Sequence, residues 1–312
     1  MSTAAMNRLA ALRAHLEQTV LGQESAVELS LLALLAGGHV LLEGPPGVGK
    51  TSLAQGLAAF FQGSFRRVQM TSDLLPSDIV GTLRLKPGTS ELEFRPGPVF
   101  SHVLLADELN RAGAKTQAAL LEAMAEGRVT VDGVTHSLPN PFFVVATQNP
   151  QEFQGVYPLA ESQLDRFMVH VSLGVPSAAA ELDLLRRYAS GNASAHSRPA
   201  ALSNEELLEL RRRVKDIFVE ESVAAYGQGI AQAVRRAEDV AHGASVRAVL
   251  QLIDAAKARA LLEGRDFVKP ADLSVLAPAV LGHRLCLRGG NLGNEERKQL
   301  VRNALEVVAA PK

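Results

Sequence analysis

The sequence has a single cysteine, Cys286, among its 312 residues, which excludes a disulfide bond within the chain. Its first residues lack the basic segment followed by an apolar segment that marks a secretory signal. The longest apolar stretch, Leu31–Leu42, is interrupted by Gly37, Gly38 and His39. It is also shorter than the about 20 residues that a membrane-spanning helix needs. We therefore expect a cytoplasmic protein with no membrane span.

The chain also lacks an excess of charge of either sign. Its formal net charge is −1 and its pI is about 6.7, so no overall positive field attracts nucleic acid or an anionic membrane surface. Hydrophobic residues make up 47% and charged residues 21% of the chain, which is ordinary for a globular protein and excludes a disordered or fibrous one. Because single cores tend to divide beyond roughly 250–300 residues, we expect two unequal domains.

Short apolar runs alternate with helix-like sequence in the first part of the chain. This pattern predicts a parallel β-sheet covered by helices on both faces, with ligands at the carboxyl ends of its strands. The runs are Val40–Leu42, Val68–Met70, Val103–Ala106, Phe142–Ala146 and Met168–Leu173. An amphipathic helix precedes them, because apolar residues recur there at helical spacing. They are Leu9, Leu12, Leu16 and Val20.

Beyond Pro176 the strand-like runs nearly stop and the sequence becomes helical, apart from a polar loop at Ser190–Ala200. We place a larger α/β domain at residues 1–175 and a helical lid at 176–312. In the lid, Ser245 can cap a helix that ends before Gly264. The apolar residues predicted to share one face of this helix are Val246, Val249, Ile253, Ala256 and Ala260.

A complete phosphate-binding loop follows the first apolar run and precedes a helical segment. Its glycines let backbone N–H groups surround phosphate, Lys50 reaches the terminal phosphates, and Thr51 is expected to bind Mg²⁺. The alternative, a glycine-rich turn without a ligand, requires this complete pattern to occur by chance. The residues that we predict to contact ATP here are Gly44, Pro45, Pro46, Gly47, Val48, Gly49, Lys50, Thr51 and Ser52.

Two acidic residues, Asp107 and Glu108, end the apolar run Val103–Ala106. A phosphate-binding-loop enzyme needs a metal-binding carboxylate at this place, so Asp107 is predicted to hold Mg²⁺. Glu108 is predicted to polarise the attacking water. The alternative is a pair of solvated acids that open a helix at Leu109, where acids are favoured in any case.

Two further residues have ambiguous local patterns. Asn149 follows the strand-like run Phe142–Ala146 and could touch the γ-phosphate, but Asn149-Pro150 is also simply a good turn. Arg166 lies between Leu164 and Phe167, where an arginine is usually a surface cation whose neighbours pack.

Taken together, these motifs resemble the MoxR family of AAA+ ATPases in order and spacing along nearly the whole chain. The segments that carry the resemblance are Gly44–Thr51, Ala106–Arg111, Ala119–Met124, Ala146–Pro150 and Glu161–Phe167. The resemblance implies an α/β fold: a P-loop AAA+ αβα sandwich with a five-stranded parallel sheet, followed by an all-helical lid. It also implies a ring, commonly a hexamer, with ATP bound between neighbouring subunits.

The resemblance also assigns roles to individual residues. Asn149 would be the sensor that reads the γ-phosphate, and Arg166 the arginine finger that reaches a neighbour's ATP. Arg247 would be the lid contact to the γ-phosphate, although Val246 stands where the family pattern has proline. The segment Val20–Gln23 is similar to the one that cups adenine, which adds Gly22 and Gln23 to the predicted nucleotide contacts.

Two inserted hairpins are predicted, at residues 82–99 and 128–137. The first has alternating residues around Lys86–Ser90, and the second has Asp132-Gly133, a strong hairpin signal, between alternating runs. They resemble the helix-2 insert and the hairpin before the first sensor of related rings, where such hairpins face the central pore. Both could also be plain surface ribbons.

The function implied is Mg²⁺-dependent ATP hydrolysis that drives chaperone-like remodelling of a protein partner, in relatives often one with a von Willebrand factor A domain. One alternative is a nucleic-acid motor, but neither hairpin carries a strong cationic stripe. A second is the ATPase subunit of a metal chelatase, which shares the first insert and the ring. A third, a binding module without turnover, is disfavoured by the intact Glu108.

Overall fold

The computed structural model describes residues 3–149, 157–190, 200–288 and 293–311. The predicted loop at Ser190–Ala200 and the turn residue Pro150 therefore lie largely or wholly outside the described residues. The chain forms two compact units. The first consists of Met1–Leu31, Leu41–Pro158 and Ser172–Leu207, and the second of Leu32–Val40, Leu159–Val171 and Leu208–Lys312. The domain boundary that we expect near residue 175 stays a prediction.

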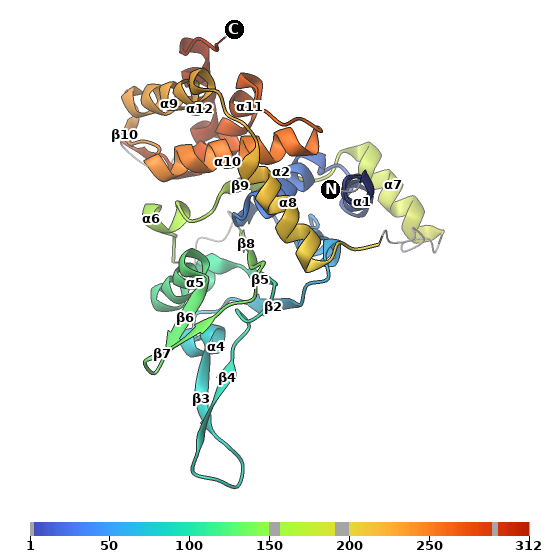
Figure 1. Cartoon of the computed structure of the whole chain (residues 1–312), viewed down its shortest axis with the longest axis vertical. Helices are drawn as coiled ribbons and strands as arrows, with labels where there is room; N and C mark the ends of the chain where they lie inside the picture. Colours follow the sequence, from blue (N-terminus) through green and yellow to red (C-terminus); the bar gives the residue numbers. More distant parts are fainter. Residues whose placement is uncertain (1–2, 150–156, 191–199, 289–292, 312) are drawn as a thin grey trace. The chain divides into compact units, whose positions relative to one another are not determined.

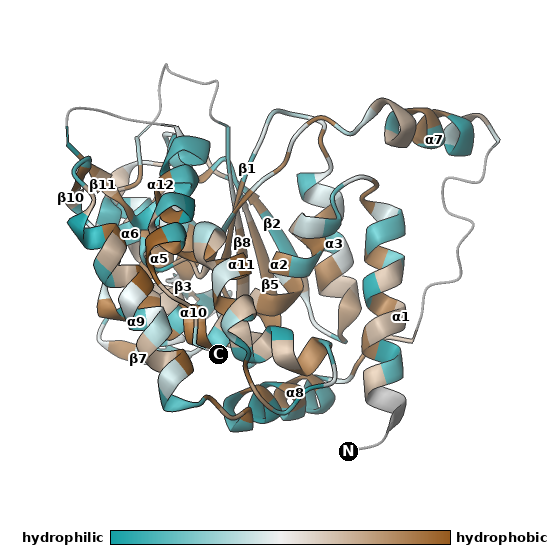
Figure 2. Cartoon of the chain, turned by 90° about the horizontal axis from the view of Figure 1, so that it is seen from above, coloured by the Kyte–Doolittle hydropathy of each residue, from teal (hydrophilic) through white to brown (hydrophobic). Residues whose placement is uncertain are grey.

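A five-stranded sheet confirms the predicted α/β fold. Its strand order is β2-β5-β8-β1-β9, and β5 pairs in parallel with both β2 and β8. Figure 2 shows β5 and β8 as hydrophobic along their lengths, whereas the edge strand β2 carries hydrophilic residues. Strands enclosed on both faces need such continuous apolar sequence. The bounds are β1 Val40–Glu43, β2 Phe65–Gln69, β5 Val103–Asp107, β8 Phe143–Gln148 and β9 Val169–Ser172.

The chain opens with helix α1, whose predicted apolar face is confirmed. Leu9, Leu12 and Leu16 are buried, as is Val20 just beyond the helix, and α1 packs against α3, the helix that follows the phosphate-binding loop. The helices of the first three-fifths of the chain are α1 Thr3–Thr19, α2 Glu24–Ala36, α3 Lys50–Phe60, α4 Pro76–Val80, the 3-10 turn η1 Leu109–Arg111, α5 Ala114–Glu126, α6 Glu161–Leu164 and α7 Ala178–Ala189.

Both predicted hairpins are present, and Figure 1 shows them side by side at one end of the first unit. The first joins β3 (Gly81–Leu85) to β4 (Leu92–Pro96), and the second joins β6 (Arg128–Val131) to β7 (Val134–Ser137). Asp132 and Gly133 both have positive φ, +48° and +82°, as a tight two-residue hairpin turn requires.

The second unit is mainly helical, as predicted for a lid, and it also contains a short antiparallel pair of strands, β10 and β11. Ser245 accepts a hydrogen bond from the backbone N–H of Ala248 at 3.1 Å and so caps α10, and Gly264 has φ +71° just past its end. The elements are α8 Asn204–Asp216, α9 Glu221–Arg236, β10 Val240–His242, α10 Val246–Leu262, α11 Pro270–Leu281, the 3-10 turn η2 Gly282–Arg284, β11 Cys286–Leu287 and α12 Asn294–Val307.

The predicted apolar face of α10 was partly wrong. Val246 is 71% exposed, and Val249 and Ile253 are only half-buried. The buried side chains are mostly small, because α10 packs closely on α11. They are Ala248, Leu252, Ala255, Ala256, Ala258, Ala260 and Leu261.

Within the described part of the chain, none of the helices combines the length and the apolar character that crossing a membrane requires.

Candidate functional site

The phosphate-binding loop connects β1 to α3, as the sequence predicts. Gly47 and Gly49 have φ of +83° and +94°, a conformation that side chains rarely tolerate. Gly44 is required for a different reason, since a Cβ there would lie 2.4 Å from the carbonyl oxygen of Leu173. The Lys50 ammonium donates to the Gly44 carbonyl at 2.7 Å. The loop thus holds its own cation beside the exposed N–H groups that begin α3, an arrangement suited to phosphate.

The segment Val20–Gln23 lies against this loop. A Cβ at Gly49 would lie 3.1 Å from Cγ1 of Val20, and the buried Gln23 donates through Nε2 to the carbonyl of Gly174 at 2.8 Å. Gly22 has φ +73° and leaves little room for a side chain, because Cβ of Ala180 would be 3.2 Å away. Of this segment Val20 contacts the loop, whereas Gly22 and Gln23 contact the stretch after β9. The contact of Gly22 and Gln23 with adenine stays a prediction.

Asp107 ends the buried strand β5 and its carboxylate has two partners. Oδ1 accepts from the hydroxyl of Thr147 at 2.6 Å, and Oδ2 accepts from Nη2 of Arg67 at 2.6 Å. Arg67 lies on the neighbouring strand β2. The carboxylate is nearly buried, so the Arg67 guanidinium compensates a charge that would otherwise be costly in this position. A cation therefore already fits beside Asp107.

Glu108 differs from Asp107 in both backbone and surroundings. Its backbone is in the left-handed region, with φ 58° and ψ 51°, which costs a non-glycine residue about 1–3 kcal/mol. Its N–H donates to Thr147 Oγ1 at 2.8 Å. Its carboxylate accepts from Gln69 Nε2 at 2.7 Å and from Arg111 at 3.2 Å, and the side chain remains 24% exposed. Glu108 is thus held in a strained, solvent-accessible position next to the buried Asp107.

Thr147 joins the two acids, and sequence reasoning missed this role. Its hydroxyl donates to Asp107 and accepts from the N–H of Glu108, and the side chain is fully buried. Gln69 and Arg67 were missed as well. Gln69 pairs in register with Asp107 across β2 and β5. The sequence feature that could have predicted its role is that a polar residue stands near the carboxyl end of the apolar run Val68–Met70.

The strand order explains why these residues meet. The ends of β2, β5, β8 and β1 lie next to one another. Strand β2 carries Arg67 and Gln69, and β5 ends with Asp107 before Glu108. Strand β8 carries Thr147 and precedes the buried Asn149, and the phosphate-binding loop follows β1. The backbone N–H of Gly44 also donates to the carbonyl of Gln148, at 3.4 Å. A phosphate cradle, a paired carboxylate and a second, accessible carboxylate therefore share one edge of the sheet, where α/β proteins bind ligands.

The predicted Mg²⁺ ligands, Thr51 and Asp107, fit the metal by chemistry. Mg²⁺ prefers hard oxygen atoms and is usually bound by one or two protein ligands together with phosphates and water. A hydroxyl and a carboxylate are such a pair. In the described part of the chain no three or more His, Cys, Asp or Glu side chains form a cluster able to hold a metal without a substrate.

Arg166 and Arg247 belong to the second unit. Arg166 is half-buried just after α6, and Arg247 is an exposed residue in the first turn of α10. Among the described residues of that unit, neither guanidinium has a hydrogen-bond or ion-pair partner. Their contacts with ATP remain predictions.

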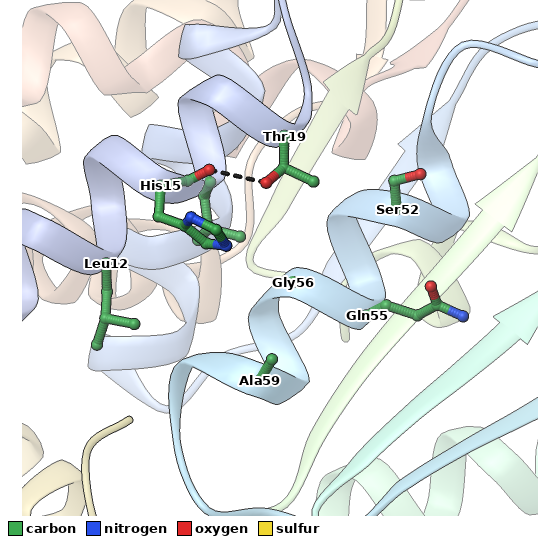
Figure 3. Close-up of a pocket in the computed structure, with 8 residues that line it drawn as sticks. Leu12, His15, Thr19, Ser52, Gln55, Gly56 and Ala59 are labelled. Carbon is green, nitrogen blue, oxygen red and sulfur yellow. Dashed lines mark hydrogen bonds between the residues drawn. The ribbon is translucent and has the colours of Figure 1, made fainter. Parts of the chain in front are cut away.

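A small cavity lies between α1 and α3, on the side of α3 that carries Ser52 (Figure 3). Its volume is about 160 Å³, below the roughly 300 Å³ at which ligand pockets begin, so a nucleotide does not fit inside it. The contact between Ser52 and ATP stays a prediction. The cavity is lined by Leu12, His15, Leu16, Thr19, Ser52, Gln55, Gly56 and Ala59.

Comparison with known proteins gives matches along nearly the whole chain. Residues 39–169 match the ATPase family associated with various cellular activities (AAA), and residues 232–303 match the AAA lid domain. A crystal structure from Cytophaga hutchinsonii, of a protein assigned as an ATPase, has a TM-score of 0.88 and 36% identity over 99% of this chain and 96% of its own.

Two bacterial relatives also match this chain over nearly its whole length. Protein YeaC of Bacillus subtilis is 43% identical over 298 residues, covering 95% of this chain and 93% of its own. Chaperone MoxR1 of Mycobacterium tuberculosis is 42% identical over 305 residues, covering 95% and 80%. Identity at this level over such lengths extends the resemblance of the motifs to both parts of the chain. The protein therefore belongs to the MoxR family of AAA+ ATPases.

Proposed function

We propose that this protein hydrolyses ATP with Mg²⁺, works as a hexameric ring and uses the energy to remodel a protein partner. The observation that carries the proposal is the pair of unlike carboxylates beside the phosphate-binding loop. Asp107 is buried and already paired with a cation, whereas Glu108 is accessible and held by Gln69 and Arg111. One carboxylate suits a metal, and the other suits a water molecule.

In this proposal Lys50 binds the terminal phosphates, and Thr51 and Asp107 hold Mg²⁺. When bound, the ion neutralises charge on the phosphate oxygens. Glu108 receives its position from Thr147 and Gln69 and orients the attacking water. Asn149 reads the γ-phosphate from the end of β8, and Arg247 contacts it from the lid.

Arg166 is proposed to act in trans, on ATP bound by the neighbouring subunit. Among the described residues of its unit the Arg166 guanidinium has no hydrogen-bond or ion-pair partner. This suits the role, because such a group can stabilise charge that develops on the phosphates without first breaking an ion pair. This part of the proposal requires a ring.

A protein partner is favoured over nucleic acid by the charges on the two hairpins. Lys86 lies 3.9 Å from Glu91 at the tip of β3–β4, and Arg128 lies 3.3 Å from Glu126 at the base of β6–β7. Basic residues that are paired in this way do not form the cationic stripe that a nucleic-acid motor needs. The naming of the Mycobacterium tuberculosis relative as a chaperone also supports a protein substrate. We extend the proposal to a partner with a von Willebrand factor A domain.

The direct test of hydrolysis is Glu108→Gln. The amide keeps the shape of the side chain but cannot serve as a base, so ATP binding should persist while turnover stops. Glu122→Gln is the matched control, because Glu122 is an exposed acid on α5 in the same unit, and it should keep the full rate. Normal turnover by Glu108→Gln would remove Glu108 from the mechanism. The ATP-locked variant should also retain the partner in a pull-down.

The test of action in trans is to mix two inactive variants. Arg166→Ala should bind ATP but turn over slowly, since arginine fingers contribute about 10³–10⁵ in rate. Lys50→Ala should lack a working pocket but carry an intact finger. Mixed rings contain interfaces that combine an intact pocket with an intact finger, so part of the activity should return. If mixed rings form and nothing returns, Arg166 acts within its own subunit or has no role.

A further inference from the structure

A buried arginine, Arg284, lies at the end of the 3-10 turn η2 in the second unit, and its side chain is only 2% exposed. Its Nη2 donates to the carbonyl of Phe167 at 2.6 Å and lies 3.4 Å from the carbonyl of Asp165. Its Nε lies 3.3 Å from the Asp165 carboxylate. Asp165 and Phe167 are the residues on either side of Arg166. The Arg284 guanidinium therefore contacts the backbone carbonyls of the residues immediately before and after the proposed arginine finger.

Two residues near Arg284 also hydrogen-bond to the residues on either side of Arg166. The ring of His283 lies with Nε2 3.0 Å from the Phe167 carbonyl. Burial, with the nearby Arg284 charge, lowers the pKa of His283 well below its usual value, so the ring is neutral and can donate a hydrogen from Nε2. The hydroxyl of Ser245 donates to the Asp165 carboxylate at 3.1 Å. Ser245 also caps α10, the helix that carries Arg247.

Burying the Arg284 guanidinium costs folding free energy. Burial lowers the pKa of Arg284 to about 10 although Asp165 opposes the shift, so the group still carries its charge at neutral pH. Among the described residues neither its Nε nor its Nη1 has a hydrogen-bond partner, and its Nη2 also donates to the side-chain oxygen of Gln251. Buried ion pairs are often no better for stability than apolar residues of the same size. A role other than stability is therefore needed to explain why a guanidinium occupies this place.

We propose that Arg284 is a positioning residue for Arg166. Because it fixes the carbonyls of Asp165 and Phe167, it fixes the backbone conformation of Arg166 and the orientation of the Arg166 side chain. The finger is then already oriented toward the neighbour's ATP before the nucleotide binds. The inference rests on the proposed role of Arg166 in trans. Two separate nitrogens of the guanidinium face these groups: Nη2 faces the two carbonyls and Nε faces the carboxylate. The single nitrogen of a lysine ammonium cannot take both places.

The variant that tests this is Arg284→Lys, which keeps the charge and removes the fork. Arg211→Lys is the matched control. Arg211 is a partly buried arginine of the same unit, burial likewise lowers its pKa to about 10, and its Nε donates to the carbonyl of Leu34 at 2.9 Å. A purely structural role for Arg284 would make the two variants alike.

For Arg284→Lys we expect kcat to fall about 10²-fold, the loss that misplacement of a catalytic group by about 1 Å produces. The KM for ATP and the thermal midpoint should match those of Arg211→Lys, which should keep the wild-type kcat. Equal kcat values in the two variants would overturn the proposal.

Mixing experiments separate a misplaced finger from a damaged pocket. Arg284→Lys subunits have an intact pocket, so mixing them with Lys50→Ala subunits should restore activity. Mixing them with Arg166→Ala subunits should restore none, because every finger is then defective. Restoration in the second mixture, or none in the first, would show that Arg284 does not act through Arg166. If Arg284→Lys fails to fold, Asp165→Asn replaces it in these experiments. We expect its kcat to fall about 10-fold, and its activity to be restored by Lys50→Ala subunits but not by Arg166→Ala subunits.

The failure of this inference differs from the failure of the proposed function. If Arg166→Ala keeps the wild-type rate, the proposed finger is wrong and the role of Arg284 falls with it. If Arg166→Ala is inactive and complemented by Lys50→Ala, while Arg284→Lys behaves like Arg211→Lys, only the positioning role is wrong.

Discussion

Thr147 is the single hydroxyl that joins the two acidic residues, and its replacement by valine is the sharpest test of the site. Valine has the same shape but cannot donate to Asp107 or accept from the N–H of Glu108, bonds of 2.6 and 2.8 Å. A hydrogen bond to a charged group contributes about 1.5–3 kcal/mol, and an unsatisfied buried N–H costs about 1–3 kcal/mol. Because solvent can reach part of Glu108, we expect a total loss of about 2–4 kcal/mol.

The loss is measured as the change in the free energy of unfolding from urea titrations of the nucleotide-free protein. ATP turnover should fall as well, because Thr147 helps to hold the strained backbone of Glu108. Thr147→Ser keeps the hydroxyl and should lie close to the wild type. Thr130→Val removes a hydroxyl that, among the described residues, is hydrogen-bonded to the exposed Thr135, 3.1 Å away, and should cost under about 0.5 kcal/mol. A Thr147→Val variant as stable as Thr130→Val would refute the reasoning.

Two further outcomes follow from the loop and the metal site. Gly44→Ala places a Cβ 2.4 Å from the Leu173 carbonyl, so the backbone must move; we expect a loss of about 1–3 kcal/mol in thermal stability and weaker ATP binding. Gly113→Ala, in open space, should show neither. Arg67→Gln removes the cation that occupies the Asp107 carboxylate, so half-maximal turnover should need up to about 5-fold less Mg²⁺. A Mg²⁺ titration with an unchanged midpoint would show that the two cations do not compete.

The parts of the fold that were predictable from the sequence are those determined by local pattern. The phosphate-binding loop needs glycine at positive φ between a strand and a helix, and Gly47 and Gly49 have that conformation. The turn at Asp132-Gly133 is equally local. Such features depend on a few neighbouring residues whose conformational limits are known in advance.

The parts that were missed depend on which strands become neighbours. Gln69 reaches Glu108 only because β2 pairs with β5, and Thr147 reaches Asp107 only because β8 lies on the other side of β5. No local pattern contains that order. Arg284 was missed for another reason. An arginine is rarely buried, so a sequence reading places it on the surface unless the partners that compensate its charge are already known.

The last prediction concerns the link between the two hairpins. The ring of Phe94 on β4 stacks on His136 of β7, with centroids 3.9 Å apart and planes 13° from parallel. Phe100 packs edge-on against Phe94, at 5.4 Å. Phe100, just beyond β4, also packs edge-on against His136, at 6.4 Å. Among the described residues, the Phe94–His136 stack is the aromatic contact that joins the two hairpins themselves. An aromatic pair contributes about 0.5–1.5 kcal/mol beyond the area that it buries, so this stack should contribute about that much to holding the β3–β4 hairpin against the β6–β7 hairpin.

His136 lies on the β6–β7 hairpin, but His136→Ala should destabilise the β3–β4 hairpin. A loss of about 0.5–1.5 kcal/mol corresponds to about 2- to 13-fold faster hydrogen exchange at the backbone amides of β3 and β4. Amides of α3 beside the phosphate-binding loop should exchange at the wild-type rate, and basal ATP turnover should not change. Val134→Ala is the control, because Val134 is an exposed residue of the same strand. Equal exchange in β3 and β4 for both variants would mean that the hairpins move independently, and force applied to one by a partner would then not reach the other through the ring stack.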